Sequence, residues 1–115
     1  MADDTHQAFI GIAQHNPDVL ENLLRARLEN QEASGLDPKT YAMVNVAALI
    51  ALDAAPASYV WQVGLALDAG VTPEELLALL VALNPVVGSA KIVAAAPELA
   101  LAIGVDLEAL QAEGA

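Results

Sequence analysis

The sequence predicts an all-α fold, a single-domain bundle of about six or seven helices over residues 1–115. Proline recurs at positions typical of a helix start, and glycine follows several apolar periodic stretches, as it does at helix ends. Strand signals are weak, because β-branched residues are scattered and no alternating run is bounded by hairpin turns. A length of 115 residues fits one domain.

Four prolines mark predicted helix starts, in Asn16-Pro17, Asp37-Pro38, Ala55-Pro56 and Thr72-Pro73. Proline is favoured at the first helical position because the N–H that it lacks has no helical partner there. A capping side chain precedes the proline in three of the four stretches. Thr72 and Glu75 have the spacing of a capping box, in which each side chain bonds the backbone N–H of the other residue.

Glycines at positions 35, 70 and 104 follow apolar stretches, as residues with positive φ after a last helical turn do. Pro97 is expected to break or kink the helix that contains it. These signals predict helices over 3–14, 17–33, 38–53, 56–69, 73–83, 86–103 and 106–112.

The predicted helices differ in how their apolar residues are placed. Helix 17–33 is amphipathic and suits a surface. The helical stretches 42–52 and 76–83 are apolar nearly all round, so they are either central or face another subunit. We therefore expect a homo-oligomer. The chain is 57% hydrophobic but only 3% aromatic, which predicts a core of Ala, Leu, Val and Ile.

Composition argues against several classes of function. The chain has no cysteine, which excludes disulfides, thiolate nucleophiles and thiol-based zinc sites. A formal charge of −11 repels nucleic acid and anionic membranes. The apolar run 76–83 is far shorter than the roughly 20 residues that span a bilayer. The acidic stretch "MADDTHQ" has no features of a secretory signal, so a cytoplasmic location is expected. No spacing suggests a metal site or a cofactor.

The stretch from Leu36 to Glu75 carries a recognisable order of features: "LDPKT" opening a helix, an alanine-rich apolar helix, a second helix start, and "ALDAGVTPEEL". This order resembles the carboxymuconolactone decarboxylase family, which includes the alkylhydroperoxidase D-like proteins, and the likeness is strongest over residues 36–95. The resemblance implies an all-helical protomer that assembles into trimers or hexamers. It also implies either thiol-dependent peroxide reduction or thiol-free decarboxylation of a lactone.

The family signature is C-x-x-C-x-x-x-H, and counting back from Gly70 places its two cysteines at Ala55 and Ser58 and its histidine at Gln62. Peroxidase members also use a glutamate on the preceding helix, where this chain has residues 41–43, "YAM". All four groups are missing, so thiol peroxidase chemistry is not expected. Ser58 lacks an adjacent base, since Gln62 cannot accept a proton at neutral pH, and we interpret the two as a polar pair that fills the space of the lost groups.

A few other polar or aromatic residues remain candidates. His6 and His15 either supply a base to the cleft or lie exposed in the N-terminal segment. Asn45 either bonds across an interface or contacts a ligand, and Lys91 either pairs with an acid or holds a carboxylate. Tyr59 and Trp61 are either core residues or the wall of a small pocket. The candidate ligand-binding residues are Asn45, Ser58, Tyr59, Gln62 and Lys91.

Three functions fit these observations. The first is a family member without thiol peroxidase capacity that serves as an oligomeric scaffold or small-molecule binder. The second is a thiol-independent lyase or isomerase for a small cyclic carboxylate, in which Lys91 holds the carboxylate and a histidine moves protons. The third is a non-catalytic subunit that pairs with an active homologue.

Overall fold

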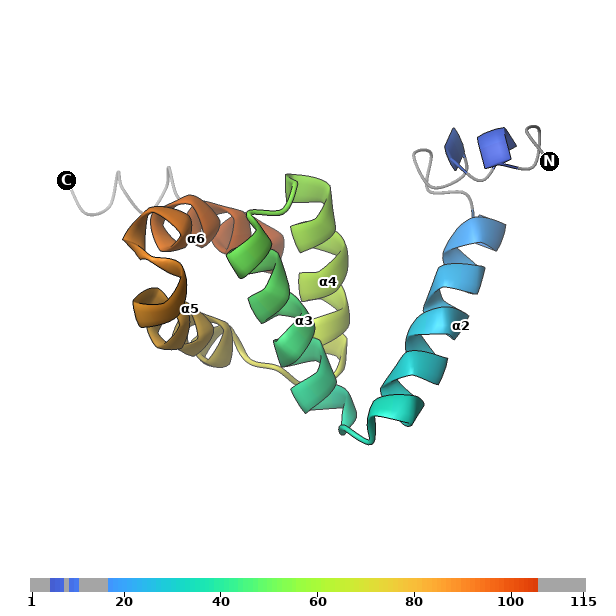
Figure 1. Ribbon diagram of the computed structural model, residues 1–115, viewed down its shortest axis with the longest axis horizontal. Helices are drawn as coiled ribbons and strands as arrows, with labels where there is room; N and C mark the ends of the chain where they lie inside the picture. Colours follow the sequence, from blue (N-terminus) through green and yellow to red (C-terminus); the bar gives the residue numbers. More distant parts are fainter. Residues whose placement is uncertain (1–4, 8, 11–16, 106–115) are drawn as a thin grey trace. The chain divides into compact units, whose positions relative to one another are not determined.

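The computed structural model describes residues 5–7, 9–10 and 17–105 of the chain (Figure 1). Within this part there is no strand, which confirms the all-α prediction. None of the helices found there combines the length and apolarity needed to cross a membrane. Residues 17–105 form the helices α2 (Pro17–Ser34), α3 (Pro38–Leu52), α4 (Pro56–Asp68), α5 (Pro73–Val87) and α6 (Ser89–Ile103).

The predicted helix starts are confirmed at all four prolines. The capping box is also confirmed, because Glu75 N donates to Thr72 Oγ1 over 3.1 Å and Thr72 N donates to Glu75 Oε1 over 3.0 Å. The glycines expected after helix ends have φ of 72°, 94° and 97°. The predicted helix 106–112 and most of the predicted helix 3–14 lie outside the described residues, although 5–7 and 9–10 are helical.

Two expectations about the later helices were wrong. Helix α5 does not end at residue 83 but continues through Pro85 to Val87, and Gly88, with φ of 90°, makes the turn into α6. Helix α6 runs through Pro97 without a break, whereas the alternative that Pro97 kinks the helix stays a prediction. Each proline removes the N–H that would bond the carbonyl four residues earlier, in Val81 and Val93, and its ring crowds that carbonyl. Val81 and Val93 are 69% and 71% exposed, so both prolines follow turns that lie at the surface.

The chain divides into two compact units, Met1–Asp37 and Pro38–Ala115. The first unit contains α2, whose surface carries the pair Arg25–Glu21 at 3.8 Å. At the end of α2, Ser34 Oγ donates to Gln31 O over 2.6 Å and accepts from Leu36 N over 3.1 Å. The single domain over residues 1–115 stays a prediction.

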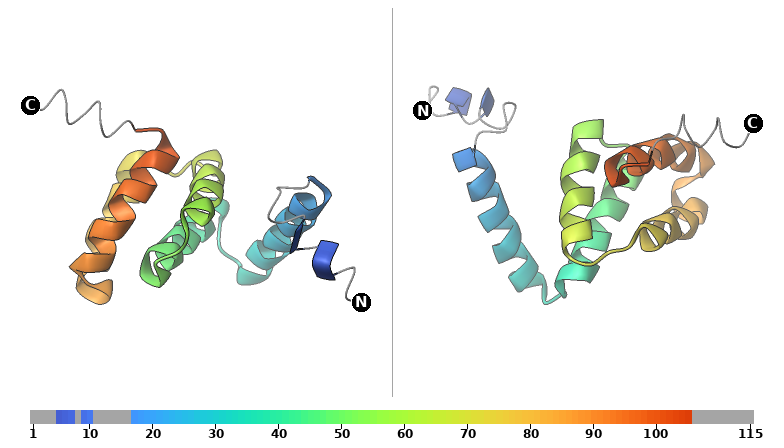
Figure 2. Two further views of the ribbon diagram at one scale, coloured as in Figure 1. Left: turned by 90° about the horizontal axis from the view of Figure 1, so that it is seen from above. Right: turned by 180° about the vertical axis from the view of Figure 1, so that it is seen from behind.

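The second unit packs α3–α6 around an aliphatic core (Figure 2). Helix α4 contacts α3 and α6, and α5 contacts α6 and α3. Val46, Ile50, Val63, Ala66 and Leu76 are fully buried. The composition predicted this kind of core. Tyr59 belongs to the same cluster, and Tyr41 is also buried.

The turn between α3 and α4 terminates α3. Asp53 has φ of 55°, Asp53 N donates to Ile50 O over 3.3 Å, and Ala54 N donates to Leu49 O over 3.1 Å. This pair of bonds is a Schellman motif, which satisfies the last carbonyls of a helix. The turn brings the C-terminal end of α3 close to the N-terminal end of α4, where the family signature falls.

Candidate functional site

The family's thiol positions lie at the start of α4. Ala55 is the N-cap residue of this helix and is exposed, and no side chain caps the helix there. Ser58 is half-buried in the first turn, where its N–H donates to Ala55 O over 3.0 Å. Gln62 lies one turn further and is also half-buried. The backbone therefore presents a helix N-terminus suited to a reactive thiol, but none of the three side chains carries sulfur.

Tyr59 is almost fully buried, with 2% of its surface exposed. Its hydroxyl donates to Leu49 O over 3.3 Å, which ties α4 to the last turns of α3. Burial raises the pKa of Tyr59 above its ordinary value, and the carboxylates of Asp53 and Glu98 raise it further. The phenol therefore stays neutral at pH 7 and acts as a hydrogen-bond donor within the fold.

Lys91 also binds the C-terminal end of α3. Its Nζ donates to Ala51 O over 2.6 Å, although the residue as a whole is exposed. Ala51 lies in the last turn of α3, where unpaired carbonyls and the helix dipole favour a positive charge. Lys91 thus links α6 to α3 across 40 positions of the sequence.

The structure therefore brings two of the five candidates together. Tyr59 and Lys91 bind neighbouring turns at the end of α3, through the carbonyls of Leu49 and Ala51. Among the described residues, no hydrogen bond joins the side chains of Asn45 or Ser58 to this pair. Asn45 is half-buried in the middle of α3, and Trp61 is half-buried on α4.

Whether either histidine supplies a base to this region stays a prediction. His6 is exposed and belongs to the first unit. His15 lies outside the described residues.

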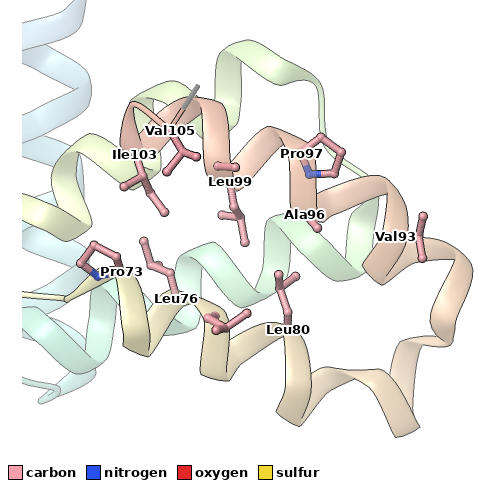
Figure 3. A pocket seen from close by; sticks show the side chains of 11 residues that line it. Pro73, Leu76, Leu80, Val93, Ala96, Pro97, Leu99, Ile103 and Val105 are labelled. Atoms are coloured by element: carbon pink, nitrogen blue, oxygen red, sulfur yellow. The ribbon is translucent and has the colours of Figure 1, made fainter. Parts of the chain in front are cut away.

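An apolar groove lies between α5 and α6, with a volume of about 600 Å³ (Figure 3). None of the five candidate residues lines it. Its lining consists only of aliphatic side chains and two prolines: Pro73, Leu76, Leu77, Leu80, Val93, Ala96, Pro97, Leu99, Ala100, Ile103 and Val105. Sequence reasoning missed this groove. The signals that could have found it are the all-round apolar stretch 76–83 and the glycine that turns the chain sharply at position 88.

A second hollow of about 480 Å³ continues the groove. It shares Leu77, Leu80, Val93 and Ala96 with the groove and adds two polar residues, Asn84 and Ser89. The described residues that line the two hollows carry no side chain that could act as a general acid or base near neutral pH. Over the residues that the structure describes, no cluster of acidic and histidine side chains could hold a metal ion.

The model of one protein family matches this chain. The carboxymuconolactone decarboxylase family model matches residues 17–101. The match begins at the first residue of α2 and ends within α6, so it covers almost all of the described helices. Neither the curated proteins nor the solved structures provided a match.

Proposed function

Because the chain belongs to the carboxymuconolactone decarboxylase family, we propose that it is a member without thiol peroxidase chemistry that serves as a homo-oligomeric helical scaffold. Peroxide reduction by a thiol pair needs a thiolate to attack the O–O bond and a second thiol to resolve the sulfenic acid. The chain has no cysteine, and Ala55, Ser58 and Gln62 stand at the signature positions. The family resemblance suggests a trimer or a hexamer.

The observation that carries the scaffold proposal is an apolar stripe on α3, formed by Val44, Ala48 and Leu52. These residues are four positions apart and so lie on one side of the helix. All three are exposed, Val44 by 52% and Leu52 by 76%. Residues 40–52 contain no charged side chain. Two protomers of formal charge −11 can therefore meet along this stripe without bringing like charges together.

The lyase alternative has weaker support. It needs a cation to hold a carboxylate and a base to move a proton. The Lys91 ammonium donates to the Ala51 carbonyl, and the Tyr59 hydroxyl donates to the Leu49 carbonyl. Both groups are thus used to fix the end of α3.

The third alternative, a subunit that pairs with an active homologue, uses the same α3 stripe. It differs from the scaffold in one measurable respect, because the purified chain alone would then remain a protomer. The molar mass of the chain in solution separates these two functions.

The test is light scattering coupled to size-exclusion chromatography, with two variants that each add one carboxylate to an exposed apolar position. Leu52→Glu places the charge on the α3 stripe, and Val86→Glu places it on the last turn of α5, where Val86 is 81% exposed. We expect the unmodified chain and Val86→Glu to elute as the same oligomer and Leu52→Glu to elute as a protomer. A protomeric unmodified chain would overturn the scaffold proposal.

A peroxide-consumption assay with a dithiol donor accompanies the mass measurement. We expect no turnover above the rate of the donor alone, because the chain supplies no thiolate. Turnover that scales with the concentration of the chain would contradict this part of the proposal.

A further inference from the structure

We propose that the α5–α6 groove binds an uncharged amphiphile, that is, an aliphatic chain with a hydroxyl or primary amide head group. This binding site is separate from the α3 stripe on which the scaffold proposal rests. It is also separate from the signature positions at the start of α4, none of which lines the groove.

The shape of the groove suits a small apolar ligand. Leu76, Leu80 and Leu99 belong to the buried core and are at most 7% exposed, so the floor of the groove is fixed by packing. Leu76 and Leu80 on α5 point across the space between the two helices toward Ala96, Leu99 and Ile103 on α6 (Figure 3). The volume of about 600 Å³ falls within the range of about 300–1,000 Å³ that is usual for small-molecule sites.

Polar groups occur at one end only, which sets the orientation of the ligand. In the second hollow, Ser89 Oγ donates to Asn84 Oδ1 over 3.1 Å. This bond leaves the Asn84 amide N–H groups free to donate and the Ser89 oxygen free to accept. A head group that both donates and accepts matches this end.

The charges of the second unit exclude a charged head group. Its basic residues are Lys39 and Lys91, and it has no histidine. Lys39 Nζ is paired with Glu75 Oε2 at 2.9 Å, and Lys91 Nζ donates to Ala51 O. A carboxylate or phosphate head group at this end would therefore gain no cation, and the formal charge of −11 of the chain repels it. Among the described residues that line the two hollows there is no acidic side chain, so an ammonium head group gains no partner from them.

The experiment uses the full chain and the neutral fluorescent probe N-phenyl-1-naphthylamine, displaced by three ligands with ten-carbon chains: 1-decanol, decanamide and decanoate. We expect saturable probe binding and displacement by the alcohol and the amide. Decanoate should compete at least about tenfold more weakly, because its charge has no partner in the groove. This comparison needs no variant and so does not depend on the folding of one.

Two matched variants locate the site on α6. Ala96 is half-buried and lines both hollows, whereas Ala94 is exposed and lines neither. We expect Ala96→Phe to fill the groove and weaken probe binding at least about tenfold, and Ala94→Phe to change it less than about twofold. Asn84→Leu should preserve probe binding but reduce the preference for decanol over decanoate.

Three outcomes would overturn the proposal: no saturable probe binding, equal competition by decanoate, or equal effects of the two phenylalanine variants. If Ala96→Phe changes the molar mass of the assembly, the groove is occupied by a second copy and the ligand proposal is wrong. The scaffold proposal fails on a different result. If the chain is a protomer in solution and still binds the probe, the scaffold proposal is wrong and the ligand proposal is supported.

Discussion

Lys91 shows how a lone cation among apolar residues can serve the fold rather than a ligand. Eleven excess negative charges make each of the four basic residues conspicuous in the sequence. In the structure the Lys91 ammonium completes the end of α3, whose Ile50 and Leu49 carbonyls already accept from Asp53 N and Ala54 N. Lys91 and Tyr59 both donate hydrogen bonds to carbonyls at the end of α3. These two candidate residues therefore stabilise the backbone at the α3–α4 turn.

The role of Lys91 is tested by Lys91→Met, which keeps the aliphatic stem and removes the donor. We expect the free energy of unfolding to fall by about 1 kcal/mol, because a charge-assisted bond to an exposed helix end is lost. Denaturant unfolding followed by circular dichroism measures this change. Lys91→Arg keeps the charge and the donors and should recover most of the loss. Equal stability of the methionine variant and the unmodified chain would show that the bond to Ala51 contributes nothing.

At the scale of elements, the start of α5 combines a capping box with a contact to α3. Glu75 accepts from Thr72 N and pairs with Lys39 of α3. The hydrogen bond from Lys39 lowers the pKa of Glu75 below its ordinary value of 4.5, and the backbone N–H of Thr72 lowers it further. A carboxylate whose pKa is lower in the folded state adds stability above its ordinary pKa, and this contribution is lost as the pH falls.

We therefore expect the stability of the unmodified chain to decrease from about pH 5 to about pH 3 more steeply than that of Glu75→Gln, whose side chain does not titrate. Urea unfolding at a series of pH values measures the two slopes. Glu74→Gln is the matched control, because it removes the same charge from the same turn without removing a member of the capping box. If Glu75→Gln follows the slope of the unmodified chain, the pair with Lys39 does not stabilise the fold.

Short-range sequence signals predicted the helix boundaries well where one or two residues determine where a helix begins. Proline at the first helical position and the Thr72–Glu75 box act within one turn, so the sequence alone reveals them. The path through Pro85 and Pro97 was not predictable in this way. It depends on whether the turns that contain Val81 and Val93 lie at the surface, which is a property of the packed helices.

The candidate residues show the same division between local and long-range effects. The absence of thiol chemistry follows directly from the residue types at the family's signature positions, which are Ala55, Ser58 and Gln62. The partners of Lys91 and the groove between α5 and α6 depend on contacts between helices, and residue periodicity does not specify these contacts. Lys91 and Ala51 are 40 positions apart, and no local pattern connects them.

At the scale of the whole molecule, apolar surface and net charge act in opposite directions. The exposed apolar side chains of α3 favour association, whereas a formal charge of −11 on each protomer opposes it. Because the α3 stripe itself is uncharged, the repulsion arises from charges away from the contact. Repulsion over such distances is sensitive to screening by salt.

Salt should therefore strengthen the homo-oligomer. Raising the ionic strength from about 10 mM to about 1 M shortens the screening length from about 30 Å to about 3 Å, which removes most of the repulsion between protomers. We expect the protein concentration at half-assembly, measured by analytical ultracentrifugation, to fall at least several-fold over this range. Leu52→Glu, which disrupts the stripe, should remain a protomer throughout. A chain that dissociates as salt is added would show instead that ion pairs hold the protomers together, because screening weakens attraction between opposite charges as effectively as repulsion between like ones.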